Sequence, residues 1–359
     1  MKNIYFTPGP AELYFTVEGH IKNALKEQIP SISHRSKTFQ GIYHEATSNL
    51  KQLLNVPDGY HIFFTGSATE IWERILENCV EHKSHHYVNG AFSERFQGTA
   101  EELTKKTDTE TAEAGSCVNP NPDLIAPDTE LIAFTLNETS TGASQPLEDI
   151  YAIHQAHPDK LIAVDAVSIL PHPDIDYTQV DTVFFSVQKA FGLPAGLGVW
   201  IVSPRCVEKA QNLQKKGINI GSYHSLPSLL SKGMKDQTPE TPNVLNIYLL
   251  SKVCADMLSK GISKIRQETE YKAALLYHAV EVHPHLNAFV KDDAYRSKTV
   301  IVADTQIPSS EIIEKLKKDN LVVGSGYGDY KSKQIRIANF PTHSKEQFEL
   351  LVDKINALK

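Results

Sequence analysis

The stretch FFSVQKAFGLPAGLG, residues Phe184 to Gly198, decides what kind of fold to expect from this chain. It begins as a continuous apolar run, which is typical of a strand that is buried on both faces of a parallel sheet. The run ends at Lys189, and the Gly and Pro residues that follow break regular structure. A lysine at a strand end is usually solvated, but its amine can also bind a carbonyl compound covalently. The rest of the sequence has to decide between these two interpretations.

Composition and charge are those of an ordinary globular protein. The 359 residues are too many for one hydrophobic core, so we expect two domains, and 41% hydrophobic with 22% charged residues is a usual balance. The formal net charge of −7 disfavours nucleic acid and anionic membranes as partners. The N-terminal stretch lacks the apolar core of a signal peptide, no apolar run is long enough to span a membrane, and the four cysteines show no CxxC spacing. We therefore expect a cytoplasmic protein.

Short apolar runs alternate with helical patterns along the first two-thirds of the chain. The apolar runs lie at residues 61–65, 86–90, 131–136, 161–166, 182–187 and 198–203. Helical periodicity lies between or before several of them, as at 35–54 and 68–80. Buried strands separated by helices predict an α/β fold with a mainly parallel sheet that is covered by helices.

A Pro- and Thr-rich stretch at 235–243 separates this part from a long helical region and a second α/β set. The second set includes predicted strands at 298–304 and 334–339 and a final helix that starts at a capping box of Ser344 and Gln347. We predict a large domain at 12–245 and a smaller α/β domain formed by 1–11 and 246–359.

Polar residues follow several of the predicted strands, and a parallel sheet would bring them to one ligand-binding edge. Lys189 can hold an aldehyde cofactor covalently, and Asp165 can bind a protonated pyridine nitrogen, which makes the ring an electron sink. The helix that starts after Gly66 offers free N–H groups to a phosphate. Phe92 could stack on the ring, and Thr139 could donate to its phenolic oxygen.

Each of these residues by itself also has a purely structural interpretation. Ser67 with Glu70 fits a helix cap, and Phe92 fits a core position. Asp165 fits a helix cap as well as a cofactor ligand, and Lys189 fits a solvated strand end. Their joint order along the chain favours the chemical interpretation.

Four segments carry a resemblance to a known family. FTPGPAEL at 6–13, ISHRSKTF at 32–39, NET at 137–139 and QKAFGLPAG at 188–196 occur in the order and spacing of the class V pyridoxal-phosphate aminotransferases. The chain is similar to this family over essentially its full length, and most of all to the phosphoserine aminotransferases. The resemblance implies a fold type I pyridoxal-phosphate transferase and a homodimer with shared active sites. It also implies transfer of an amino group between an amino acid and a 2-oxo acid such as 2-oxoglutarate.

The resemblance also implies roles for individual residues. Lys189 would be the Schiff-base lysine and proton shuttle, Asp165 would pair with the pyridinium nitrogen, and Phe92 would stack on the ring where phosphoserine aminotransferases usually have tryptophan. Thr139 would bond the phenolic oxygen or its surroundings. The other implied contacts are with the cofactor phosphate from the same subunit (Ser67, Ala68, Gln188), with that phosphate from the neighbouring subunit (Gln237, Thr238), with the substrate α-carboxylate (Arg336) and with the distal end of the substrate across the dimer (His34, Arg35).

Two segments depart from the phosphoserine aminotransferase pattern. Those enzymes have an arginine in the turn after the first strand, where this chain has Thr69. They also have a His-Arg pair about seven residues before the carboxylate arginine, where this chain has Asp329 and Tyr330. Each charged contact to a phosphate contributes about 1.5–3 kcal/mol, so these losses predict weak phosphoserine binding. The amino donor is open between phosphoserine and another small amino acid, as in an alanine- or serine–glyoxylate or pyruvate enzyme of the class.

Other chemistries are less favoured by the sequence. A desulfurase with the same cofactor carries a reactive cysteine late in the chain, but no cysteine follows Cys254. A non-catalytic relative would not need Lys189, Asp165 and Arg336 together. The histidine-rich segments at 82–86 and 283–287 lack metal-ligand spacing, so we expect solvated loop histidines and no metal site.

Overall fold

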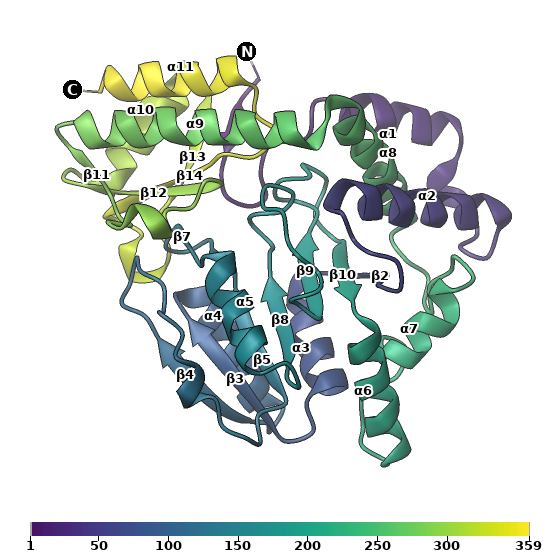
Figure 1. The fold of residues 1–359 in the computed structure, drawn as a ribbon. Coiled ribbons are helices and arrows are strands. Elements are labelled where there is room, and N and C mark those ends of the chain that lie inside the picture. The colour runs from purple at the N-terminus through teal and green to yellow at the C-terminus, as the bar shows by residue number, and fades with distance from the viewer. Residues whose placement is uncertain (1, 359) are drawn as a thin grey trace.

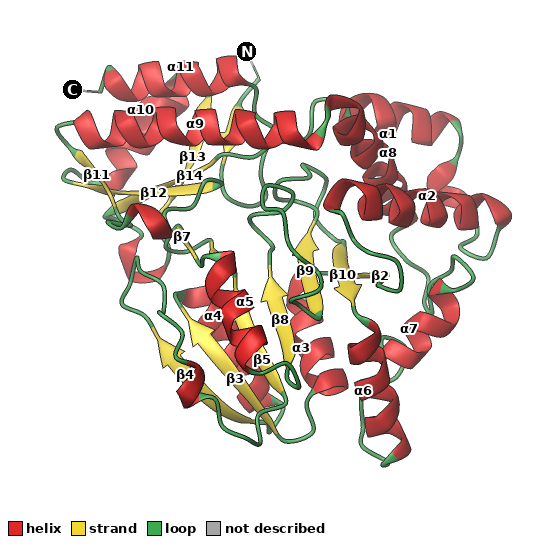
Figure 2. Ribbon diagram, in the orientation of Figure 1, coloured by secondary structure: helices red, strands yellow, loops and turns green. Residues whose placement is uncertain are grey.

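The computed structural model describes residues 2–358, and a seven-stranded sheet lies at its centre (Figures 1 and 2). The strand order is β2 (His61–Thr65), β10 (Gly198–Val202), β9 (Thr182–Ser186), β8 (Leu161–Asp165), β5 (Leu131–Thr135), β3 (Lys83–Val88) and β4 (Lys106–Thr111). β10 runs antiparallel to β2 and β9, and all other neighbouring strands of this sheet are parallel. The predicted mainly parallel sheet is confirmed, and the carboxyl ends of the other strands share one edge.

Alternate residues of the large sheet face two different cores. Ile132 and Phe134 face the first core, whereas Leu131 and Ala133 face the second. The first core is covered by α1 (Val17–Lys26), α2 (Lys37–Leu54), α5 (Leu147–Ala156) and α8 (Val244–Lys260). The second core is covered by α3 (Ala68–Cys79), α4 (Ala91–Glu102), α6 (Pro204–Lys215) and α7 (Leu226–Gly233). Because both faces are covered, inner strands such as β5, β8 and β9 are apolar at nearly every position.

A second sheet of five strands forms the smaller domain. Its order is β1 (Ile4–Phe6), β13 (Leu321–Ser325), β14 (Gln334–Ala338), β12 (Val300–Thr305) and β11 (Leu286–Ala288). It packs against α9 (Ile262–Val282), α10 (Ser309–Lys318) and α11 (Lys345–Asn356), and α11 starts at the predicted capping box. Figure 1 shows this domain above the large sheet, with both ends of the chain on it.

Several short elements complete the fold. β6 (Asn137–Glu138) and β7 (Ala143–Ser144) form a two-stranded ribbon. Four 3-10 turns lie at Ile29–Ser31, Pro122–Leu124, Asp293–Tyr295 and Gly328–Tyr330. No helix within residues 2–358 combines the length and hydropathy that a membrane span requires.

The predicted long helical region consists of two helices. Gly261 separates α8 from α9, and its φ of 88° lies in the left-handed region that favours glycine. The apolar side chains of α8 lie in the same core as those of α2. The division at 245 and 246 stays a prediction, and this packing leads us to propose a boundary near Gly261 instead.

The expectation that the histidines at 82–86 lie in a solvated loop is wrong for two of them. His85 and His86 are 1% exposed because β3 begins at Lys83 rather than at residue 86. His86 Nε2 lies 2.8 Å from the Ser84 hydroxyl, and burial lowers the pKa of His86 to about 3. Burial likewise lowers the pKa of His85 to about 4, so both imidazoles are neutral parts of the sheet.

Candidate active site

Six predicted site residues line one cavity of about 230 Å³ at the carboxyl edge of the large sheet. They are Ala68, Phe92, Thr139, Asp165, Gln188 and Lys189. Asp165 ends β8, and β9, its parallel neighbour, ends three residues before Lys189. These residues are far apart in the sequence but meet because neighbouring parallel strands end at the same edge.

Lys189 lies in the connection between β9 and the antiparallel β10, which accounts for the Gly- and Pro-rich bend. Its Nζ donates to the Pro8 carbonyl at 2.5 Å, and a Cβ on Gly9 would lie only 2.3 Å from the same nitrogen. Burial and the nearby charge of Arg336 lower the Lys189 pKa to about 8, although Asp165 opposes this change. A substantial fraction of the amine is therefore neutral near pH 8, as a nucleophile requires.

Asp165 is almost completely buried, and both of its carboxylate oxygens are oriented by donors. Trp72 Nε1 donates to Oδ2 at 2.9 Å, and the Val167 amide donates to Oδ1 at 3.0 Å. Burial raises the Asp165 pKa to about 6, against the effect of these hydrogen bonds. Trp72 also lines the cavity, but the sequence indicated only a core position for it, because a helix stripe does not reveal where an indole N–H points.

Glu138 holds the helix that carries Phe92. Its carboxylate accepts from the Phe92 amide at 3.1 Å, the Ser93 amide at 3.0 Å and the Ser140 hydroxyl at 2.7 Å. A Cβ on Gly90 would lie 2.4 Å from Glu138 Cγ, so only glycine fits there. Sequence reasoning missed this role of the middle residue of the NET motif. A carboxylate near a helix N-terminus was the available signal.

The start of α3 lines the cavity only in part. Ser67 caps this helix by accepting from the Glu70 amide at 3.1 Å, as its sequence context suggested, and it does not itself line the cavity. The Ala68 amide donates to the Ser186 hydroxyl at 3.0 Å. Ser186 lines the cavity as well, and sequence reasoning did not include it.

A buried histidine joins the start of α3 to the segment at 235–243. His224 Nδ1 contacts the Glu70 carboxylate, and His224 Nε2 lies 3.0 Å from Glu240 Oε2. Burial alone would lower the His224 pKa, but the two carboxylates raise it to about 9. The imidazole is therefore charged at neutral pH and bridges two anions.

Arg336 links the small domain to the large one beside the cavity. From β14 its Nε donates to the Ser325 carbonyl at 2.8 Å, and Nη1 donates to the Thr139 carbonyl at 3.2 Å. The guanidinium carbon lies 5.3 Å from the centre of the Tyr327 ring. Arg336 does not line the cavity itself, but its partner Thr139 does.

The four residues implied to act across a dimer form a separate group. Arg35 Nη1 donates to Gln237 Oε1 at 3.0 Å and to the Thr238 carbonyl at 2.7 Å. Arg35 Nη2 donates to the Pro239 carbonyl at 3.2 Å, and His34 is the neighbour of Arg35 in the chain. None of these residues lines the cavity of the same chain.

Two unsatisfied polar atoms show that the cavity suits a polar guest. Within residues 2–358, Thr135 Oγ1 and Asn137 Oδ1 are buried without a hydrogen-bond partner, and both residues line the cavity. Buried polar groups are normally paired, so a ligand with hydrogen-bonding atoms fits this site. Together with a nucleophilic amine and a buried carboxylate, the cavity fits a pyridine aldehyde cofactor.

The positions that depart from the phosphoserine pattern lie in two places. Thr69 lines the cavity, so the site lacks a cation there. Asp329 and Tyr330 lie on the 3-10 turn Gly328–Tyr330 of the small domain and line a neighbouring groove.

Comparisons with known proteins agree with this geometry. Residues 10–330 match the family Aminotransferase class-V. The phosphoserine aminotransferase of Rhodococcus opacus (strain B4) is 28% identical over 330 residues, which cover 90% of this chain and 87% of that protein. The chain therefore belongs to the class V aminotransferases, and it transfers an amino group between an amino acid and a 2-oxo acid.

Solved structures place the chain in the same fold. A phosphoserine aminotransferase from Cytophaga hutchinsonii ATCC 33406 superposes with a TM-score of 0.96 at 51% identity, covering 99% of this chain and 98% of that one. An aspartate aminotransferase from Thermus thermophilus has a TM-score of 0.86 at 22% identity and covers 99% of both chains. The second likeness concerns the fold alone.

Proposed function

We propose that this aminotransferase uses pyridoxal 5'-phosphate and that phosphoserine is not its preferred amino donor. The observation that carries the first part is the single cavity that brings the Lys189 amine and the Asp165 carboxylate together. The chemistry of the lining agrees with the class V family and with a structure of the same fold, a phosphoserine aminotransferase that contains a Schiff base.

In the proposed complex, Lys189 would hold the cofactor aldehyde carbon covalently and Asp165 would accept the hydrogen bond of the ring nitrogen. Phe92 would lie against the ring, and Thr139 would bind near its phenolic oxygen. The phosphate would lie near the start of α3 and Gln188, with Ser67 and Ala68 as neighbours. When bound, the cofactor stabilises the negative charge that develops at the substrate α-carbon as its proton leaves.

The protein side chains would carry out the remaining work. Arg336 would bind the substrate α-carboxylate, because a planar guanidinium suits two parallel hydrogen bonds to a carboxylate. Once the amino donor has displaced it from the cofactor, the free Lys189 amine, with its pKa lowered to about 8, would take the α-proton and later donate a proton. Amino transfer then proceeds as a double displacement with ping-pong kinetics.

Absorption spectroscopy tests the cofactor. We expect the purified protein to bind pyridoxal 5'-phosphate with the yellow colour of a protein-bound imine and to lose that colour when an amino acid is added. The Lys189→Ala variant should bind the cofactor without this absorption band. A wild-type protein that takes up no pyridoxal 5'-phosphate would contradict the proposal.

The donor proposal rests on missing positive charge. Thr69 stands in the cavity and Asp329 and Tyr330 stand beside it, where a phosphate would need cations. The test measures amino donors against 2-oxoglutarate, glyoxylate and pyruvate, with phosphoserine included. A kcat/KM for phosphoserine above about 10⁴ M⁻¹s⁻¹ would show that it is a normal substrate and would overturn this part. Efficient turnover of alanine or serine with glyoxylate or pyruvate would support the alternative within the class.

A homodimer would complete each site. Gln237 and Thr238 would reach the cofactor phosphate of the other subunit, and His34 and Arg35 would face the distal end of its substrate. This arrangement is supported by their clustering away from the cavity of their own chain. Mixing two inactive variants, Lys189→Ala and Gln237→Ala with Thr238→Ala, should restore part of the activity, because one site of a mixed dimer has only native residues. Failure of a co-expressed mixture to recover any activity would exclude shared sites.

A further inference from the structure

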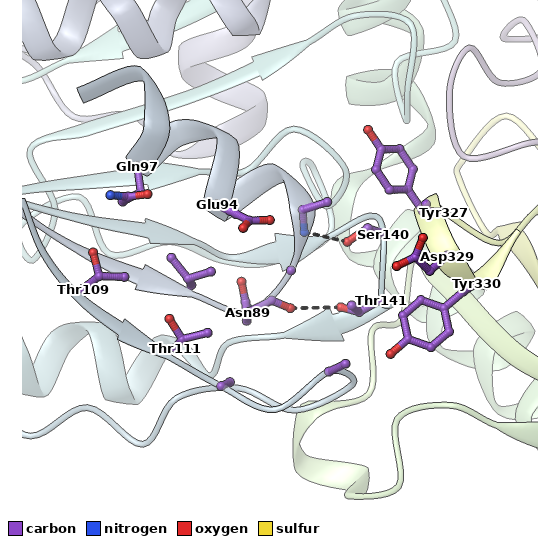
Figure 3. A pocket seen from close by; sticks show the side chains of 16 residues that line it. Asn89, Glu94, Gln97, Thr109, Thr111, Ser140, Thr141, Tyr327, Asp329 and Tyr330 are labelled. Atoms are coloured by element: carbon purple, nitrogen blue, oxygen red, sulfur yellow. Dashed lines mark hydrogen bonds between the residues drawn. The ribbon is translucent and has the colours of Figure 1, made fainter. Parts of the chain in front are cut away.

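A groove of about 450 Å³ lies between the two domains beside the cofactor cavity. One wall is formed by the carboxyl end of β3, by β4 and by the first turns of α4, and the other by the small-domain residues 327–330 (Figure 3). Glu94 and Tyr327 of this groove also line a depression that contains Phe92 and Trp72 of the cofactor cavity. The groove therefore continues toward the cofactor cavity around Phe92.

The groove carries negative charge without a compensating cation. Figure 3 shows Glu94 on α4 facing the groove from one side and Asp329 facing it from the small domain. Both residues are exposed, and neither carboxylate has an ion pair or hydrogen bond within residues 2–358. No lysine, arginine or histidine of this part of the chain lines the groove. Walls of one sign lower the free energy of a bound cation and raise that of an anion.

Asn89 supplies an independent indication of a ligand. The residue is 4% exposed, lines the groove, and has no hydrogen-bond partner for Oδ1 among the described residues. Its Nδ2 is directed to the Thr135 carbonyl at 3.4 Å and to Cys117 Sγ at 3.6 Å. An unpaired buried carbonyl oxygen costs about 1–3 kcal/mol, which an N–H donor from a ligand would recover.

A serine and two tyrosines also line the groove near Asn89. The Ser140 hydroxyl donates to Glu138 and accepts from the Ala91 amide, so its proton is already used within the protein. Tyr327 and Tyr330 stand at the small-domain side, where Tyr327 already contacts Phe92 and Arg336, and Tyr330 contacts Phe289. The two exposed carboxylates and Asn89 Oδ1 are thus acceptors of the groove without a partner within residues 2–358.

We propose that this groove binds a protonated amine, with Glu94, Asp329 and Asn89 Oδ1 as its acceptors. The inference rests in part on the proposed function, because Tyr327 joins the groove to Arg336, where the α-carboxylate of the amino donor would lie. The amine is then either the side-chain ammonium of a diamino acid donor or a separate small amine that binds at the domain joint. Both sources present the same chemistry to the groove.

Kinetics of the cofactor-loaded enzyme test the first source. Ornithine and norvaline have the same carbon chain and differ in the terminal amine, so their kcat/KM ratio isolates the groove. We expect ornithine to be favoured about tenfold or more, as one charge-assisted hydrogen bond would give. The double variant Glu94→Gln with Asp329→Asn should bring the ratio toward one and leave norvaline unchanged. Glu314→Gln, at an exposed position on α10, is the matched control and should leave the ratio intact.

Calorimetry with 1,4-diaminobutane tests the second source, since this amine has no α-carboxylate. Binding that is weakened in the double variant but not in Glu314→Gln supports the groove even when ornithine and norvaline react equally, and it identifies a separate amine. The proposal is overturned when ornithine has no advantage and 1,4-diaminobutane does not bind, or when the double variant changes neither measurement. If no amino acid reacts at all, the proposed function fails, and calorimetry still decides on the groove.

Discussion

The cofactor cavity is built almost entirely from the large domain, whereas the groove beside it opens between the two domains. In the cavity, Asp165 is held by Trp72 and Val167, and its position follows from the end of β8. In the groove, Asp329 is an exposed residue on a short turn of the small domain with no partner within residues 2–358. We therefore expect the sheet edge to determine the reaction and the small-domain turn to influence the choice of substrate.

The physical reason lies in how much each region depends on packing. A strand end such as Asp165 has two neighbouring strands and helices on both faces, so a change there disturbs the core. Asp329 and Tyr330 of the turn Gly328–Tyr330 are exposed, so replacing either side chain costs little stability. Side chains on this turn can therefore change without changing the fold.

The largest effect is expected at Lys189, and its absence would overturn the assignment of the chemistry to the cavity. Lys189→Ala removes both the covalent anchor and the proton carrier, so kcat should fall by about 10⁴-fold or more. Steady-state rates with the best amino donor measure this, and Lys264→Ala on the exposed side of α9 is the control. A variant with native turnover would show that another residue performs the chemistry.

Substitutions of Arg336 test whether this residue binds the substrate rather than the cofactor. Arg336→Ala should lower kcat/KM for any α-amino acid by about 10²-fold or more, because two charge-assisted hydrogen bonds are lost. The kcat/KM of Arg336→Lys should lie between those of Arg336→Ala and the native enzyme, since lysine keeps the charge but lacks the planar guanidinium. Fluorescence titration with pyridoxal 5'-phosphate should show unchanged cofactor affinity. An equal loss of cofactor affinity would mean that Arg336 supports the fold rather than the substrate.

Restoring cations to the turn would sharpen the contrast between the two regions. The double variant Asp329→His with Tyr330→Arg should raise kcat/KM for phosphoserine by about 10- to 100-fold, because each charged contact adds about 1.5–3 kcal/mol. Asp329→Asn alone should give a smaller rise through the loss of repulsion. The cofactor spectrum should not change in either variant. If phosphoserine kinetics stay constant, the distal group of the substrate does not approach this turn.

The smallest effect concerns stability and comes from His224. Its pKa of about 9 in the fold lies above the ordinary value of about 6.5, so its stabilising effect is complete below about pH 6.5 and is lost as the pH rises through 9. His224→Gln should lower Tm by on the order of 2 °C at pH 6.5. The difference from the native protein should shrink above pH 9. Thermal unfolding followed by circular dichroism measures it, and a difference that is constant with pH would exclude a charged bridge between Glu70 and Glu240.

Much of the fold could be predicted because its signals are local. The continuous apolar run before Lys189 indicated a doubly covered strand, and the capping box at Ser344 marked the start of α11. β4 escaped prediction because its sequence, KTDTET, is polar and lies at an exposed sheet edge. The start of β3 was also misplaced because its residues are polar. His85 and His86 nevertheless lie inside the sheet, which buries them in neutral form.

Residue types and their order along the chain indicated a site for an aldehyde cofactor, because a lysine after a strand and an aspartate at the end of another are local features. The resemblance of the quoted motifs to a known family then implied an aminotransferase. The tertiary structure alone showed that Trp72 orients Asp165, that Glu138 holds Phe92 in place, and that Asp329 faces Glu94 across a groove. These contacts join residues far apart in the chain, and their energies depend on burial and distance rather than on sequence spacing. Packing between the two domains therefore decided that the Glu94 and Asp329 carboxylates line the same groove.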